Sequence, residues 1–350
     1  SSLKVQREIS PLQGLQARLS KDGVEVDFAR GYVGDVTGAY NGVTTGQNLE
    51  DKRSEAELIA EAVEKAKAAD CVILFGGLNK SDYQDCEGHD RQQYELPYAQ
   101  DKLITAIAAA NKNFVYVNIS GNAVAMPWRD KVPAIVQGWY LGSEAGEALA
   151  SVLTGDANPS GKLPFTWVKS LQNVGAHALN TYPGTWRKEG GSKTEGNIID
   201  EEYKESIYVG YRWADRKKQR PVFAFGHGLS YTQFAISNLR ADKASMTAAD
   251  SITFTVQVKN IGQRAGSETV QLYVHDAKAS VDRPLKELKG FSKVSLQPGE
   301  SKDVSITLGK DALSFYDETT ASWKAEPGQF EAWVGNASDN LKLRKSFQLK

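Results

Sequence analysis

The stretch that decides the fold runs from Asp51 to Gly77 and reads DKRSEAELIAEAVEKAKAADCVILFGG. In its first part, residues 51–70, apolar side chains recur three and four positions apart, beginning with Leu58, as on the buried face of an amphipathic helix. Its second part, CVILFGG at 71–77, is short, continuously apolar and closed by two glycines. Such a run is typical of a strand that is covered on both faces.

The same alternation of helix and strand continues along the chain. LPYAQDKLITAIAAANKN (96–113) predicts a second helix, FVYVNISGNAV (114–124) a second buried strand and IVQGWYLG (135–142) a third. A further helix is expected from Ser143, as its N-cap, to Gly155, as its stop. This order indicates an α/β sandwich with a mostly parallel sheet and covering helices. In such sheets, functional residues gather in loops at the carboxyl ends of the strands.

The last third of the chain has a different pattern. Apolar and polar residues alternate strictly in SITFTVQVKN (251–260), ETVQLYVHD (268–276), KDVSITLG (302–309) and GQFEAWVGN (328–336). Short alternating strands separated by turn residues predict an all-β sandwich. The sequence therefore predicts two domains, 1–236 and 237–350, and the first includes a long irregular region at about 165–228.

Composition narrows the class of protein. Of the 350 residues, 41% are hydrophobic and 24% charged, and the net charge is −1, as in globular proteins with real cores. We expect no nucleic-acid partner, because the net charge of −1 leaves no excess of basic residues. We expect no membrane partner, because no apolar run approaches the ~18 residues of a spanning helix. The start, SSLKVQREIS, does not read as a signal peptide. Of the two cysteines, Cys71 is expected to be a small buried hydrophobe.

An acidic loop, SDYQDCEGHDRQQYELP at 81–97, follows the first strand. The simplest interpretation is a solvated polar loop. Cys86 and His89 with nearby carboxylates are zinc or calcium ligand types. No second Cys/His pair lies in range, however, and the regular spacing of a calcium loop is missing, so no metal is expected. A nucleophilic Cys86–His89 pair lacks an orienting third group.

A general acid is the fourth interpretation of this loop. Cleavage of a glycosidic bond usually needs a carboxylic acid that protonates the leaving oxygen, opposite a second carboxylate. A Glu crowded by Asp82, Asp85 and Asp90 would have its pKa raised by the like charges and stay protonated near neutrality. These residues alone do not decide which carboxylate would act.

The wider sequence resembles one known family. EGHDR, placed after an apolar strand and before ELPYAQDKLI, resembles the acid/base loop of glycoside hydrolase family 3. ISPLQGL, GSEAGEALASVLTGDANPSGKLPFTW and FGHGLSYTQF resemble the α/β-sandwich domain of that family. VKNIGQRAGSETVQLYV, DRPLKELKGFSKVSLQPGES, ALSFYDE and EPGQFEAWVG resemble its fibronectin type III-like domain. The resemblance covers essentially the whole chain.

The resemblance implies an activity and roles for residues. It implies a retaining exo-β-glycosidase, a β-glucosidase or alternatively a β-xylosidase, acting without a cofactor on β-linked oligosaccharides or aryl glycosides. The Glu of the family's motif, the catalytic acid/base, is Glu87 here. Asp90 and Arg91 would hold the shape of the loop. Tyr83 and His89 are candidates for sugar contacts on aromatic and polar character alone.

The resemblance also implies missing parts. Members of the family begin with a (β/α)₈ barrel that carries the nucleophilic Asp, and no part of this sequence corresponds to it. The first strand of the α/β domain is expected to be missing too, which would leave an open sheet edge. We therefore expect a piece of a longer polypeptide, with the barrel in the same protein or in a separate chain. The alternative is a non-catalytic carbohydrate-binding or structural subunit. The resemblance is compatible with a periplasmic or secreted location, and these residues do not demand one.

Overall fold

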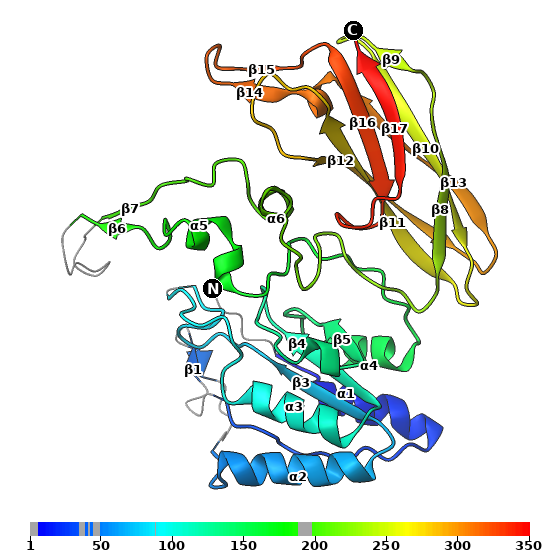
Figure 1. The fold of residues 1–350 in the computed structure, drawn as a ribbon. Coiled ribbons are helices and arrows are strands. Elements are labelled where there is room, and N and C mark those ends of the chain that lie inside the picture. The colour runs from blue at the N-terminus through cyan, green and yellow to red at the C-terminus, as the bar shows by residue number, and fades with distance from the viewer. Residues whose placement is uncertain (1–5, 35–38, 41–42, 45–49, 88, 188–197) are drawn as a thin grey trace. The chain divides into compact units, whose positions relative to one another are not determined.

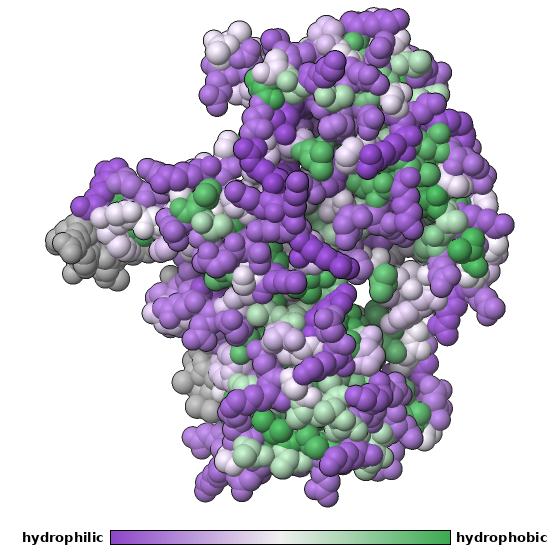
Figure 2. Space-filling view, in the orientation of Figure 1, coloured by the Kyte–Doolittle hydropathy of each residue, from purple (hydrophilic) through white to green (hydrophobic). Residues whose placement is uncertain are grey.

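The structure is a computed structural model that describes residues 6–34, 39–40, 43–44, 50–87, 89–187 and 198–350 (Figure 1). The chain folds as two compact units, Ser1–Ala157 and Asn158–Lys350. Hydrophilic side chains cover most of the visible surface, with apolar ones scattered between them (Figure 2). Among the described residues, no helix is long and apolar enough to cross a membrane.

The first unit is built on a parallel sheet of three strands in the order β3-β4-β5. In its register, Val72 lies opposite Phe114 and Val115 opposite Ala134. The central strand is the most buried, because it has a hydrogen-bonded neighbour on each side; Tyr116 is fully buried. The predicted parallel sheet is thereby confirmed. The strands are β3 (Val72–Gly77), β4 (Phe114–Ile119) and β5 (Ala134–Gln137), and β1 (Ala39–Tyr40) pairs antiparallel with β2 (Val43–Thr44).

Four helices accompany this sheet: α1 (Pro11–Leu19), α2 (Glu55–Ala68), α3 (Gln100–Ala110) and α4 (Ala145–Thr154). Helix α3 packs against β3, β4 and α2, and α1 packs against α4. The α1–α4 contact requires glycine on both sides, because a Cβ atom on Gly14 would lie 2.1 Å from the carbonyl oxygen of Gly146. The two helices therefore meet backbone to backbone.

Two details of the sequence-based prediction are wrong. The N-cap of α4 is Glu144, without a side-chain cap, and not Ser143. The carbonyl of Ser143 instead accepts a hydrogen bond from the Ile9 amide at 2.9 Å, which joins the α4 start to α1. Cys71 is exposed and not buried, because it lies just before the first residue of β3. Gly155 does end α4, with φ of 81°.

The second unit contains an antiparallel sandwich. One sheet has the order β13-β10-β8 and the other β12-β11-β16-β17-β9. Alternate residues of β10, from Ile252 to Val258, enter the core between the sheets, as the alternation predicted. The strands are β8 (Phe234–Ala241), β9 (Ser245–Met246), β10 (Ser251–Asn260), β11 (Gly266–Asp276), β12 (Glu287–Leu296), β13 (Ser301–Gly309), β16 (Gly328–Gly335) and β17 (Leu343–Leu349), with a hairpin of β14 (Phe315–Asp317) and β15 (Ser322–Lys324).

Residues 158–233 precede the sandwich in the same unit and contain only short elements among those described. These are the 3-10 helix η3 (Leu171–Asn173), α5 (Gly175–Ala178), β6 (Thr185–Trp186), β7 (Ile199–Asp200) and α6 (Tyr211–Lys217). Ion pairs tie the segment to the sandwich: Lys162 to Glu268 at 2.7 Å and Asp215 to Lys286 at 2.5 Å. The first sandwich strand begins at Phe234. The domain boundary near Ser237 stays a prediction.

Candidate active site

The candidate site is the loop between β3 and α3, at the carboxyl end of β3. The strand ends at Gly77, where φ is 132° and a Cβ atom would lie 2.0 Å from the carbonyl oxygen of Ile119 in β4. Only glycine fits this conformation and this close approach. The chain therefore passes directly against the backbone of β4 where it leaves the sheet.

A buried glutamine joins the two ends of the loop. The side chain of Gln100, 0% exposed, accepts a hydrogen bond from the Gly77 amide at 2.7 Å. Its amide group donates to the carbonyl of Gly77 at 2.9 Å and to that of Pro97 at 3.0 Å. Because the first residue of α3 bonds to the last residue of β3, the root of the loop is fixed.

Asp85 anchors the loop to both neighbouring strand ends. Its carboxylate accepts hydrogen bonds from the Gly121 amide at 2.7 Å and the Asn122 side-chain amide at 2.9 Å, both in the loop after β4. It also accepts one from the Tyr140 hydroxyl at 2.8 Å, after β5. Three loops at the carboxyl ends of the parallel strands thus meet at one carboxylate, where α/β sheets place their functional sites.

Arg91 makes a second connection to the loop after β4. Its guanidinium donates to the side-chain oxygen of Asn122 at 2.9 Å and to the carbonyl of Ala123 at 2.6 Å. Burial lowers the pKa of Arg91, an effect that the negative charge of Asp85 opposes. The guanidinium still remains cationic at neutral pH. Asn122 donates one bond to Asp85 and accepts one from Arg91, so it bridges the two flanks of the acidic segment.

Glu87 lies between these two anchors and is exposed. Asp85 is two residues before it and Arg91 four residues after it. Asp90 is exposed as well. The loop therefore presents Glu87 to the outside from a segment that is held on both sides.

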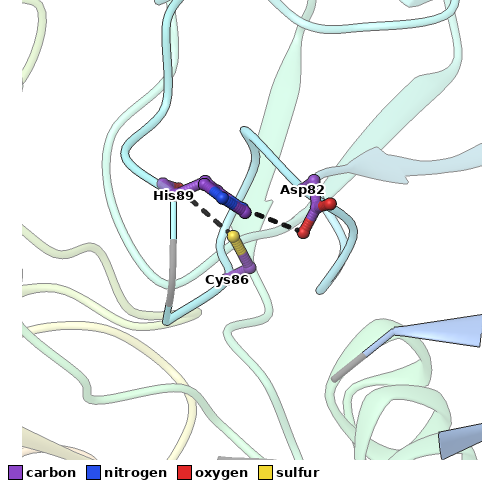
Figure 3. Close-up of side chains that lie close together, drawn as sticks. All are labelled: Asp82, Cys86 and His89. Atoms are coloured by element: carbon purple, nitrogen blue, oxygen red, sulfur yellow. Dashed lines mark hydrogen bonds and ion pairs between the residues drawn. The ribbon is translucent and has the colours of Figure 1, made fainter. Parts of the chain in front are cut away.

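The other predicted side chains form a group of their own. The Tyr83 and His89 rings lie 5.0 Å apart at an interplanar angle of 33°, and each side chain is about half exposed. Nδ1 of His89 lies 3.2 Å from a carboxylate oxygen of Asp82. Cys86 donates a hydrogen bond from its thiol to the carbonyl of His89 at 3.2 Å. Figure 3 shows Asp82, Cys86 and His89 directed toward one another.

A cavity of about 340 Å³ adjoins the root of the loop. Its lining includes Arg30, Tyr32, Asn79 and Tyr98, and the rings of Tyr32 and Tyr98 stack at 6.3 Å. Burial raises the pKa of Tyr32 to about 12, so its hydroxyl stays protonated at neutral pH. The hydroxyl of Tyr98 accepts a hydrogen bond from Gln84 at 2.5 Å, which links the cavity wall to the loop. An aromatic and polar hollow thus lies beside the acidic segment.

Sequence reasoning missed the residues that hold the loop. The sequence indicates Asp85 only as a like charge near Glu87, and it assigns no role to Gln100, Asn122 or Tyr140. The available signal was position, since SGN and WYLG each follow a predicted strand. Their pairing with Asp85 spans 36 to 55 positions, and local patterns do not reveal it.

Comparison with known families agrees with this architecture. Residues 1–231 match the model of the glycosyl hydrolase family 3 C-terminal domain, and residues 268–338 match that of the fibronectin type III-like domain. The chain therefore belongs to glycoside hydrolase family 3.

Individual relatives give a consistent picture. The chain is 46% identical to Beta-glucosidase BoGH3A of Bacteroides ovatus, over 99% of its own length and 44% of that protein. It is 42% identical to thermostable beta-glucosidase B of Acetivibrio thermocellus, over 87% of its length and 38% of that protein. The crystal structure of a GH3 beta-glucosidase from Bifidobacterium adolescentis superposes with a TM-score of 0.81 at 33% identity, over 98% of this chain and 46% of that one. The chain thus spans less than half the length of these relatives.

Proposed function

We propose that this chain supplies the acid/base loop of a retaining exo-β-glycosidase, a β-glucosidase that releases terminal, non-reducing β-linked sugars. Glu87 is the general acid/base. The observation that carries the proposal is the placement of an exposed Glu87 between Asp85 and Arg91, which both bind the loop after β4. The beta-glucosidase relatives support the choice of sugar.

The proposed reaction needs two carboxyl groups. A carboxylate nucleophile attacks the anomeric carbon while Glu87 protonates the leaving oxygen, and a covalent glycosyl intermediate forms. Glu87, now ionised, removes a proton from the water that releases the sugar. The nucleophilic Asp belongs to the family's N-terminal barrel, outside this chain, as part of the same protein or as a separate chain.

The remaining residues have supporting roles in this proposal. Arg91 keeps the loop in shape through its two bonds to the loop after β4. Asp90 stays a proposed loop-structuring residue. The Tyr83 and His89 rings, packed together and half exposed, are the proposed contacts for the sugar or its leaving group. The substrates are β-linked oligosaccharides and aryl glycosides.

The deciding experiment varies the leaving group. Glu87→Gln should lower kcat/KM about 10²- to 10⁴-fold for alkyl β-glucosides, whose leaving groups need protonation. Dinitrophenyl β-glucoside, with a good leaving group, should be cleaved almost as fast in the first step. Added azide should then accelerate turnover, because it replaces the water that Glu87 no longer activates. Glu95→Gln removes an exposed carboxylate from the same loop and is the matched control.

Equal loss of activity on both substrate classes, with no azide effect, would refute the assignment of Glu87. The position of the nucleophile is tested separately. Hydrolysis of aryl β-glucosides is assayed with the 350-residue chain alone, and then with the chain mixed with the N-terminal barrel that precedes this domain in the family. Activity only in the mixture supports the two-part site, whereas activity of the chain alone contradicts it. Sugar binding without hydrolysis in either sample would favour a carbohydrate-binding subunit.

A further inference from the structure

Three potential metal ligands converge on the loop that carries Glu87. A carboxylate oxygen of Asp82, the sulfur of Cys86 and a ring nitrogen of His89 all lie within 4.8 Å of one another. Nδ1 of His89 is the nitrogen that faces Asp82, at 3.2 Å (Figure 3). One oxygen, one sulfur and one nitrogen thus surround a single point beside the candidate acid/base.

We propose that Asp82, Cys86 and His89 form a binding site for a zinc-like transition metal ion. Zinc takes these donors at about 2.0–2.3 Å in a tetrahedron, which places donor atoms roughly 3.3–3.8 Å apart. The observed separations, from 3.2 Å to at most 4.8 Å, need only small side-chain adjustments to reach that geometry. A thiolate ligand selects zinc and related metals over calcium or magnesium.

The fold explains why linear spacing concealed this site. The sequence argument predicted no metal because Cys86 and His89 have no second Cys/His pair in range. The third ligand is instead a carboxylate, which the chain supplies by turning back at Tyr83, where φ is 62°. The Tyr83 ring then packs on the His89 ring at 5.0 Å and limits its rotation.

The site is also attached to a fixed base. Asp85, directly before Cys86, is bonded to the loops after β4 and β5, and Arg91 follows two residues after His89. Two ligands are therefore close in sequence to anchored residues. Less chain entropy is lost when a metal binds a segment that is already constrained.

Metal binding would exchange existing contacts for metal bonds. The Cys86 thiol gives its proton to the solvent as the sulfur–metal bond forms, and its hydrogen bond to the His89 carbonyl is lost. His89 binds through Nδ1 in its neutral form, with the proton on Nε2, and Asp82 binds as a carboxylate. The three ligands leave the fourth tetrahedral position to water.

A consequence for activity rests on the proposed function of Glu87. Cys86 and His89 flank Glu87 on both sides, so a bound ion closes the segment 86–89 into a ring. The ring fixes the backbone on both sides of Glu87 and so changes where its carboxyl group lies relative to the leaving oxygen. We expect zinc to inhibit hydrolysis through this loop.

Cobalt(II) is the probe for the site, because a thiolate ligand gives it an intense charge-transfer band in the near ultraviolet. The intact protein that carries this chain is reduced, freed of metal with a chelator and titrated with cobalt. Cys86→Ser should abolish the band. His89→Ala and Asp82→Asn should each weaken binding at least about tenfold, since even outer-sphere partners cost that much.

Two matched controls make the test specific. Cys71→Ser removes the chain's other, exposed thiol, and Glu95→Gln removes an exposed carboxylate of the same loop. Both should bind cobalt like the unmodified protein. A missing thiolate band, or one that disappears with Cys71→Ser, would overturn the site.

The inhibition is measured apart from the binding. Zinc should lower aryl β-glucoside hydrolysis, chelator should restore it, and Cys86→Ser should make it insensitive to zinc. A thiolate–cobalt band without zinc inhibition would refute the effect on Glu87 while the site stands. The cobalt spectrum does not depend on any activity, so failure of the proposed function and failure of the metal site are distinguishable.

Discussion

Asp85 provides the sharpest test of how the loop is built. Its carboxylate joins the acidic loop to the loops after both β4 and β5. Asp85→Ala removes three hydrogen bonds at once but touches no part of the sheet or its helices. We expect it to loosen the loop and leave the rest of the unit folded.

The expected loss of activity in Asp85→Ala follows from the three hydrogen bonds that the carboxylate accepts. A hydrogen bond to a charged group is worth about 1.5–3 kcal/mol, and we take ~1 kcal/mol each because Asp85 is only half-buried. The three together give ~3 kcal/mol of loop ordering. Arg91 keeps its own bonds to Asn122 and Ala123, so part of the order remains. We expect kcat/KM to fall roughly ten- to a hundredfold, since each 1.36 kcal/mol is a factor of ten.

Tyr140→Phe removes only one of the three bonds, and we expect about a fivefold loss from ~1 kcal/mol. In the double variant with Asp85→Ala, the Tyr140 change should add almost nothing, because its acceptor is already missing. Activity is measured on an alkyl β-glucoside, and amide hydrogen exchange at Gly121 reports the anchor without any activity. Thermal unfolding checks that the fold is intact. Additive losses, or unchanged exchange at Gly121 in Asp85→Ala, would falsify the proposed anchor.

Two further predictions concern stability. Gln100→Ala should lower the free energy of unfolding by about 3 kcal/mol in urea titrations, because it leaves buried groups of Gly77 without partners. Gln92→Ala, an exposed glutamine of the same loop, is the control, and an equal loss there would contradict the role of Gln100. Arg18 lowers the pKa of the Asp156 carboxyl from 3.8 to about 2. This pair should stabilise the fold above pH 4 and lose that contribution as the pH falls toward 2. The thermal midpoints of Asp156→Asn and unmodified protein should therefore differ near pH 6 and converge near pH 2; a constant difference would exclude the pair as the cause.

The fold could be predicted because its signals are local. The helix periodicity before CVILFGG recurs before FVYVNISGNAV and indicates the parallel sheet, and the alternation in residues 251–260 indicates a sandwich strand. Ser143 shows where this reasoning fails. A serine before a helix usually caps it, but here its carbonyl bonds to Ile9, 134 positions away, and the helix begins later. Tertiary contacts of that kind leave no local pattern.

The candidate site divides in the same way. EGHDR after an apolar strand is a local signal, and it placed the acidic loop at the end of β3. The anchoring of Asp85 and the convergence of Asp82, Cys86 and His89 depend on how the chain turns, and on partners in other loops. Rules that recognise metal sites from sequence assume ligands at fixed intervals. They fail where a residue in the left-handed conformation, such as Tyr83, turns the chain so that Asp82 lies beside Cys86 and His89.

The contacts of the acidic residues change the reasoning about how a general acid works here. From the sequence, the like charges around Glu87 are expected to keep its carboxyl group protonated. In the structure, Asp85 accepts three hydrogen bonds and Asp82 faces His89. In the proposed mechanism the nucleophilic carboxylate adds a further negative charge, which favours the protonated acid before attack and is lost once the glycosyl bond forms. This coupling makes the proposed acid give up its proton at the step that needs it.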